Sequence, residues 1–196
     1  MRTPWGYDVD AAVDPIVDVS DFNRITGGAF VANPRVEAAL MAASQAVRNA
    51  CGWHVSPSLE CTAHPVGGGA VLRLSAGYVS SIESITVDGE TISSDDYQWR
   101  SDGLVRLTNG RKWTDDWGAI EVAYTAGYSA DAVPDLVEAV VAIASGVLSV
   151  SAGVISESAD GVSVSYSANA SSIAAALTSQ QQAALAPYKV VNSHAS

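Results

Sequence analysis

The chain has 196 residues, of which 48% are hydrophobic and 16% charged, a composition typical of a globular protein rather than a disordered one. This length accommodates one domain with a core and a sizeable insertion, but hardly two independent domains. The net charge is −11, from 21 acidic and 10 basic residues, whereas a protein that grips nucleic-acid phosphates needs the opposite balance. Specific DNA or RNA binding is therefore not expected, although DNA can pass an acidic wall without being held.

Residues 1–33 are acidic and rich in turn formers, and they predict an extended N-terminal arm. The first residues contain no apolar run typical of a secretory signal, so synthesis in a reducing cytoplasm is the default expectation. At Asn33 and Pro34 the pattern changes, because Asn33 suits the N-cap and Pro34 the first position of a helix. Apolar residues then recur at helical spacing, and Gly52 is typical of a helix end.

From about Leu59 the spacing of apolar residues shortens to two, which indicates strands. Asp88 and Gly89 lie between apolar residues and give the strongest hairpin signal in the chain. Alternation returns at Ile120 in the last strand. We therefore expect residues 57–127 to form a small antiparallel sheet, curled or sandwiched, that is inserted between helices.

A second apolar helix is predicted from Pro134. No charged residue occurs between Ala139 and Ile155, a run near the short limit for a membrane span. Serines and glycines interrupt this run, and Asp135 and Glu138 stand at its entrance. These features favour a helix buried by protein over a membrane span.

The C-terminal part contains one alternating stretch, with Val162, Val164 and Tyr166 on one side. A last short helix is predicted near Thr178 or Ser179, where Ser179 and Gln182 fit a capping box, and Pro187 ends it. The predicted fold is therefore α+β, a small helical bundle core with an inserted antiparallel β domain and extended termini. Its parts are the arm 1–33, the helical core 34–56 and 128–189, the β insert 57–127 and the tail 190–196.

The stretch from residue 51 to residue 64 holds both cysteines and two of the three histidines, namely Cys51, His54, Cys61 and His64. Thiolate and imidazole are the ligands of structural zinc sites, so this spacing suggests a zinc centre. However, Cys61 and His64 lie three residues apart on a predicted strand and point to opposite faces. We therefore expect both cysteines to be packed as apolar residues, with no metal or cofactor, while a disulfide stays open without support from the pattern.

No nucleophile elbow, phosphate-binding loop or zinc-protease helix motif occurs in the chain. A phosphate-binding loop is followed by a helix and a lysine, and neither follows the glycines at 67–69. These glycines therefore indicate a connection between strands. Two acidic pairs, Asp95-Asp96 and Asp115-Asp116, suggest calcium only if the loops converge, whereas loop acids are mostly solvated. A catalytic site is therefore not predicted.

Four aromatic residues of the β insert leave two interpretations open. Aromatic rings on a β module stack on sugars, which favours a carbohydrate-binding site. Alternatively, the rings pack a small core or anchor a protein interface. The four residues are Tyr97, Trp99, Trp113 and Trp117.

Several ordered segments together resemble the head-to-tail connector, or adaptor, proteins of long-tailed double-stranded DNA phages. The segments are PRVEAALMAASQAVRNACGWHVSP at 34–57, IEVAYTAGY at 120–128, VPDLVEAVVAIAS at 133–145, GVSVSYS at 161–167 and LAPYK at 185–189. The resemblance implies a structural virion protein that forms a ring of twelve beneath the portal. Such a ring extends the DNA channel and provides the docking platform for a tail-side stopper or head-completion protein. DNA passes without specific binding, and no membrane is involved.

In this family the terminal segments often reach the portal or neighbouring subunits, which makes the arm 1–33 and the tail 187–196 interface candidates. The candidate side chains, with two tryptophans of the insert, are Trp5, Tyr7, Phe22, Trp113, Trp117, Pro187, Tyr188 and Lys189. The resemblance places the protein at the head–tail interface of a virion assembled in the host cytoplasm. A carbohydrate- or receptor-binding tail module and a zinc-dependent enzyme built on residues 51–64 remain the alternatives.

Overall fold

The computed structural model describes residues 1–149, 157–159, 162–164 and 177–190. These residues form helices and antiparallel sheets, which confirms the predicted α+β class. The chain divides into two compact units. The sheet unit contains the described residues of Met1–Val13, Cys51–Ala132 and Tyr188–Ser196, and the helical unit contains those of Asp14–Ala50 and Val133–Pro187.

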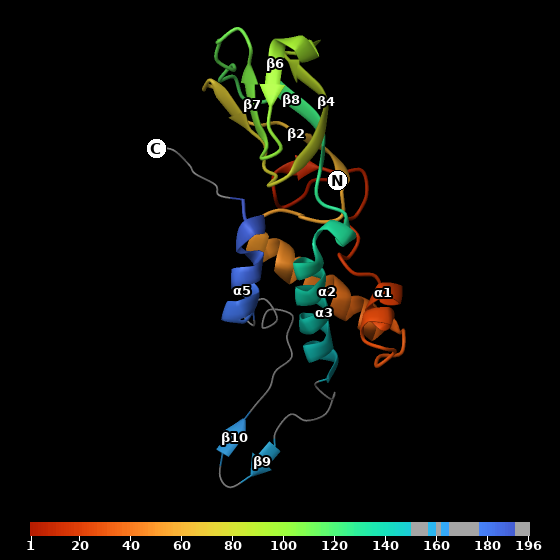
Figure 1. The fold of residues 1–196 in the computed structure, drawn as a ribbon. Helices are drawn as coiled ribbons and strands as arrows, with labels where there is room; N and C mark the ends of the chain where they lie inside the picture. The colour runs from red at the N-terminus through yellow and green to blue at the C-terminus, as the bar shows by residue number, and fades with distance from the viewer. Residues whose placement is uncertain (150–156, 160–161, 165–176, 191–196) are drawn as a thin grey trace. The chain divides into compact units, whose positions relative to one another are not determined.

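The helical unit is built from four α-helices within the described residues (Figure 1). They are α1 (Val19–Ile25), α2 (Pro34–Cys51), α3 (Pro134–Ser149) and α5 (Ser179–Leu185), and a 3-10 turn, η3 (Ala186–Tyr188), follows α5. The unit also holds a small antiparallel hairpin of β9 (Glu157–Ala159) and β10 (Val162–Val164). The strand over Val162 and Val164 agrees with the predicted alternation, whereas Tyr166 lies outside the described residues.

Helix α1 occupies part of the predicted extended arm and is an element that the sequence pattern does not predict. Its N-cap is Asp18, whose Oδ1 accepts a hydrogen bond of 2.7 Å from the backbone N–H of Asp21. Phe22 anchors the helix because its ring is fully buried and stacks on Phe30 with 5.4 Å between ring centroids. A helix this short depends on such a tertiary contact, since its own hydrogen bonds barely offset the cost of nucleation.

Helix α2 begins and ends where the sequence predicts. Asn33 Oδ1 accepts hydrogen bonds from the N–H groups of Arg35 (2.9 Å) and Val36 (3.2 Å), so Asn33 is the N-cap. The helix ends before Gly52, whose φ of +81° lies in the left-handed region. Its buried apolar stripe consists of Val36, Ala39, Leu40, Ala43, Ala46 and Val47.

Two polar side chains on the buried side of α2 hold the preceding segment against the helix. Ser44 Oγ accepts a hydrogen bond of 3.0 Å from the N–H of Ile16, and the guanidinium of Arg48 donates to the carbonyl of Asp14. Both side chains are buried, at 0% and 1% exposure. Since buried polar groups are costly without partners, these bonds fix where the segment lies on the helix.

Helix α3 buries Leu136, Ala139, Val140 and Ala144, while Val137, Val141 and Leu148 are half-buried. No helix among the described residues is both long enough and apolar enough to cross a bilayer. Residues 150–155 of the uncharged run lie outside the described part of the chain.

The capping box of α5 lies one residue before the predicted position. Thr178 has extended backbone angles (φ −62°, ψ 158°) and is the N-cap, and Gln181 closes the box. The predicted pair, Ser179 and Gln182, is wrong because Ser179 already belongs to the helix. The α-helix ends at Leu185, before Pro187, as predicted.

The sheet unit contains two antiparallel sheets (Figure 1). The five-stranded sheet has the order β1-β2-β8-β4-β5, with β1 (Tyr7–Asp8), β2 (Leu59–Ala63), β8 (Ile120–Ala126), β4 (Val79–Val87) and β5 (Glu90–Thr91). The three-stranded sheet has the order β3-β7-β6, with β3 (Val71–Arg73), β7 (Leu104–Leu107) and β6 (Tyr97–Trp99). Two 3-10 turns, η1 (Ser94–Asp96) and η2 (Ala130–Ala132), complete the unit. Asp88 and Gly89 form the turn between β4 and β5, both at positive φ, which confirms the predicted hairpin.

The inner faces of the two sheets form the core of this unit. Burial alternates strictly along β8, where Ile120, Val122 and Tyr124 are buried and Glu121 is exposed. Leu72 of β3, Tyr97 of β6 and Val105 of β7 are buried as well. Trp113 is 3% exposed, and its indole Nε1 donates a hydrogen bond of 3.3 Å to the carbonyl of Val105. Trp113 is therefore a core residue of the sheet unit.

Replacing Trp113 with alanine is expected to lower the free energy of unfolding by about 3–5 kcal/mol, because the change removes a large buried ring and leaves a cavity. Trp117 offers a matched control, since its side chain is 90% exposed. We expect W117A to change stability by less than about 0.5 kcal/mol. Urea denaturation followed by circular dichroism measures both, and equal effects of the two variants would contradict the assignment of Trp113 to the core.

Candidate functional site

Trp53 lies at the centre of an aromatic cluster that follows α2 in the sheet unit. Its side chain is fully buried, and a Cβ added at Gly77 would lie 3.0 Å from two ring atoms, so backbone packs directly on the indole. The Trp53 ring contacts His54 and Tyr128 with centroids 5.3 Å and 6.1 Å away. The C-G-W-H stretch is therefore packed inside the fold.

Both ring nitrogens of His54 take part in hydrogen bonds. Nδ1 lies 2.5 Å from the Tyr7 hydroxyl, and Nε2 lies 3.0 Å from the carbonyl of Ala126. A Cβ at Gly127 would lie only 2.6 Å from Nε2 and 2.4 Å from the carbonyl of Pro57, which explains why glycine stands there. These contacts join β1, the end of α2 and β8, so the role that the structure assigns to His54 is structural.

The C-terminal residues dock on the same cluster. Trp53 Nε1 donates a hydrogen bond of 2.7 Å to the carbonyl of Tyr188, and the N–H of Val190 donates to the carbonyl of Cys51 at 3.0 Å. The Tyr188 ring lies 5.8 Å from that of Tyr128. Backbone and ring contacts thus fix Tyr188, while the Lys189 side chain is exposed.

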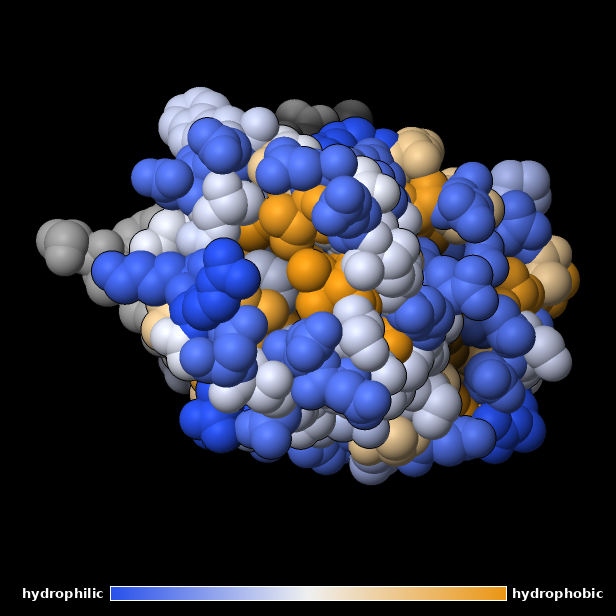
Figure 2. Space-filling model, turned by 90° about the horizontal axis from the view of Figure 1, so that it is seen from above, coloured by the Kyte–Doolittle hydropathy of each residue, from blue (hydrophilic) through white to orange (hydrophobic). Residues whose placement is uncertain are grey.

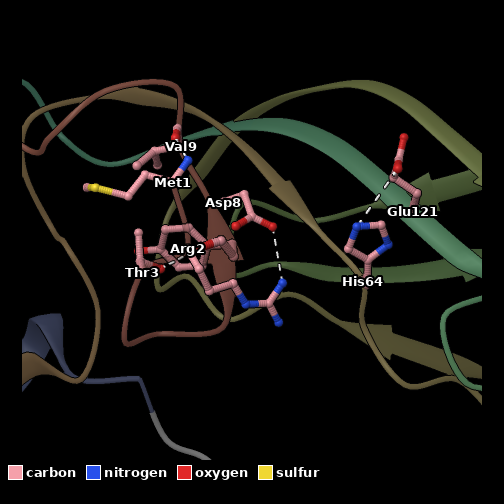
Figure 3. A network of polar contacts seen from close by, with 8 residues as sticks. Met1, Arg2, Thr3, Asp8, Val9, His64 and Glu121 are labelled. Carbon is pink, nitrogen blue, oxygen red and sulfur yellow. Dashed lines mark hydrogen bonds and ion pairs between the residues drawn. The ribbon is translucent and has the colours of Figure 1, made fainter.

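The first nine residues fold back on themselves instead of extending away (Figure 3). The amino group of Met1 donates to the carbonyl of Val9, and Thr3 Oγ1 donates to the carbonyl of Tyr7 at 2.7 Å. Arg2 forms an ion pair of 3.1 Å with Asp8. Because β1 also pairs with β2, these residues are part of the sheet unit, whereas the sequence predicts an extended arm over 1–33.

The structure separates the predicted interface residues into three groups. Tyr7, Phe22 and Trp113 are buried and present no surface to a partner. Trp5 and Tyr188 are half-buried in the aromatic cluster. Trp117, Pro187 and Lys189 are exposed. Burial of Trp113 also removes it from the set of rings proposed to stack on sugars.

The residues considered for metal binding do not converge. Cys61 is buried at 3% exposure, whereas the His64 side chain is 37% exposed and lies 3.9 Å from Glu121 on the other face of the sheet (Figure 3). Burial raises the pKa of the Cys51 thiol to about 11 and that of Cys61 to about 12, which disfavours the thiolate that zinc requires. Both thiols are free, and the described residues hold no group of three or more potential metal ligands.

The acidic pairs considered for calcium are engaged with their own loops. The N–H of Asp95 donates to Ser93 Oγ at 3.4 Å, and the carboxylate of Asp116 accepts a hydrogen bond of 3.0 Å from Thr114 Oγ1. These are local turn contacts, and they need no ion.

The solvent-facing sides of the two sheets and the loops between the strands carry charged side chains whose grouping was not predicted from the sequence. Half of the ten basic residues lie between residues 73 and 112, a concentration that the sequence already contains. They are Arg73, Arg100, Arg106, Arg111 and Lys112, all exposed. Figure 2 shows hydrophilic residues over most of the visible surface, with apolar residues in separate places among them. Surfaces of this kind suit polar, orienting contacts.

Residues 16–177 match the model of a protein family described as Head completion protein. Comparison with curated proteins finds no match. Among solved structures, the fold is similar to a chain in the neck of an empty GTA particle computed with C6 symmetry, with a TM-score of 0.64 at 15% identity. It is also similar to a chain in the neck of a native GTA particle computed with C12 symmetry, with a TM-score of 0.61 at 14% identity. Each likeness covers 97% of this chain and 98% of the other. At these identities the likeness shows a shared fold.

The buried thiols predict a specific pH dependence of stability. Their pKa values are raised from 9.0 to about 11 and 12 in the folded state, so their contribution is complete below about pH 9 and is lost as the pH rises through the folded values. We expect the free energy of unfolding to fall less steeply above about pH 9 in C51A/C61A than in the parent chain. Urea titrations from about pH 7 to pH 10 measure this difference. Identical slopes, or rapid labelling of both thiols in the folded chain at neutral pH, would contradict the burial of these groups.

Proposed function

Because the chain belongs to the head completion protein family, we propose that it is the adaptor of a phage-like neck and forms a ring of twelve copies beneath the portal. Family membership gives the chain a structural role in the head–tail connector region of a virion. The ring extends the DNA channel from the portal and provides the platform for the next tail-side protein.

The observation that carries this proposal is the family match over residues 16–177, and the likeness in fold to neck chains over 97% of the chain supports it. One of those necks is computed with C6 symmetry and the other with C12 symmetry. Both symmetries are compatible with a ring of twelve, since a twelve-fold ring also contains the six-fold axis.

The charge of the chain supports a passage for DNA rather than a binding site. With a net charge of −11, the ring repels phosphates on average, so DNA in the channel is guided without being held. A structural role also agrees with His54, Cys51 and Trp53, whose contacts hold the sheet unit together. We expect assembly at the head–tail interface, in the cytoplasm of the host.

The exposed candidates supply contacts with other neck proteins. Trp117 is 90% exposed on the loop before β8, and a ring so accessible is typical of an interface anchor. Pro187 and Lys189 are exposed where the chain leaves α5. We assign these residues to contacts with the portal or the tail-side protein.

Deletion of the protein is expected to leave DNA-filled heads that are not joined to tails, because the portal then lacks its adaptor. Electron microscopy of the particles made with and without the protein measures the fraction of joined heads. Re-expression of the parent chain restores joining, whereas W117A is expected to reduce it while the variant stays folded. Joined particles that contain no copy of the chain would overturn the adaptor proposal, and a neck reconstruction with another copy number would overturn the ring of twelve.

A further inference from the structure

The outer face of the three-stranded sheet is basic. The registers Val71↔Arg106, Arg73↔Leu104 and Gln98↔Arg106 place these side chains on one face, opposite the buried Leu72 and Val105. Arg100 continues β6 beside Leu104, to which its N–H donates at 2.9 Å. We define the basic face as Val71, Arg73, Gln98, Arg100, Leu104 and Arg106.

The three arginines of this face are exposed, and only Arg100 has an ion pair with a described residue. Arg106 donates to Gln98 Oε1 at 2.8 and 3.3 Å, and Arg100 pairs with Asp102 at 2.9 Å, whereas Arg73 has no ion pair with a described residue. Two open hollows of about 370 and 440 Å³ share Val71, Gln98 and Arg106 in their lining. Arg111 borders the larger hollow and adds a further positive charge.

The outer face of the five-stranded sheet is acidic. Glu60 pairs with Thr125 and Glu121 with Thr86 in the registers of β8, so both carboxylates lie on the face opposite Val122 and Tyr124. Glu83 joins them, because its carboxylate accepts a hydrogen bond of 2.7 Å from Thr125 Oγ1. We define the acidic face as Asp8, Glu60, Thr62, Glu83, Thr86, Glu121 and Thr125.

Only part of the acidic face has a neighbouring basic side chain. Arg2 pairs with Asp8, and His64 lies 3.9 Å from Glu121. Within the described residues, neither Glu60 nor Glu83 has a cationic partner. The remaining side chains are small threonines, which leave the carboxylates accessible.

The two faces lie on opposite sides of the core of the sheet unit, which suits a ring. A closed ring joins each copy to the next through two different surfaces that must be complementary. In a ring of twelve, successive copies are rotated by only about 30°, so these surfaces lie nearly opposite each other on one subunit. We propose that the basic face of one copy packs against the acidic face of the next, an inference that rests on the proposed ring.

Opposite charge also explains why the contact is head-to-tail. A two-fold dimer would place basic face against basic face or acidic against acidic, and both arrangements are repulsive. Exposed ion pairs are individually weak, so the faces set the orientation and register of neighbouring copies more than the affinity. The partner is a second copy because the same chain supplies both complementary faces in the same unit.

Charge reversal of each face tests this contact. The full-length variants R73E/R106E and E60K/E121K are each expected to weaken self-association at least about tenfold at low salt. An equal mixture is expected to restore it, since every contact in a ring of alternating variants is again between opposite charges. Analytical ultracentrifugation over a range of concentrations measures association, and circular dichroism verifies that the variants fold. R24E/R35E, with the same change in net charge outside the sheet unit, is the control and is expected to associate like the parent chain.

The outcomes distinguish this inference from the proposed function. If both variants form rings as the parent chain does, the faces are not the contact, while the ring stands. If the parent chain stays monomeric at all concentrations, the ring and its contact are overturned together. If the mixture fails to recover, or if R73E/R106E instead loses binding to short duplex DNA, the basic face has a partner other than a second copy. Recovery in the mixture alone supports the proposed contact.

Discussion

The burial of Trp53 is the constraint on which the sheet unit depends. The indole packs directly on the backbone at Gly77, contacts His54 and Tyr128, and donates its one hydrogen bond to the carbonyl of Tyr188. A single side chain therefore joins residues next to β4 and β8 to the C-terminal residues of the sheet unit. His54 extends the same contact set to β1 through Tyr7. Burial of a large aromatic ring stabilises the fold in proportion to the apolar area removed from water, and the buried N–H needs a hydrogen-bond acceptor. Position 53 therefore fixes both the packing and the orientation of the ring.

In the sheet unit, the polar groups near Trp53 are buried, whereas the charged side chains lie at the surface. His54 is buried with both ring nitrogens in hydrogen bonds. Burial also raises the pKa values of the Cys51 and Cys61 thiols well above neutrality. The charged side chains of the sheet unit lie at its surface, on the outer faces of the two sheets and on the loops between strands. For a member of the head completion protein family, such a division is physically reasonable. Stability comes from apolar burial, and in the proposed ring the charged faces set the orientation of neighbouring copies.

Much of the local structure follows from the sequence alone. Asn33 and Pro34 fix the start of α2, Asp88 and Gly89 fix a hairpin, and the alternation from Ile120 fixes the buried side of β8. Helix α1 could not be predicted, because its seven residues depend on the contact between Phe22 and Phe30. The capping box of α5 was misplaced by one residue, since Thr178 and Ser179 both suit a cap and only the backbone angles distinguish them. Residue type alone did not separate buried from exposed rings, because Tyr7, Phe22 and Trp113 are buried whereas Trp117 is exposed.

The sequence by itself determined the α+β class, most helix and strand positions and the resemblance to connector proteins, because these depend on local periodicity, capping and ordered motifs. Only the tertiary structure decided which aromatic rings are exposed, that residues 1–13 join the sheets, and which charged strand residues share the outer face of each sheet. These features depend on the pairing of strands far apart in the chain, such as β1 with β2 and β3 with β7. Strand register decides which side of a sheet each side chain occupies, and register is a property of the partner strand as much as of the strand itself.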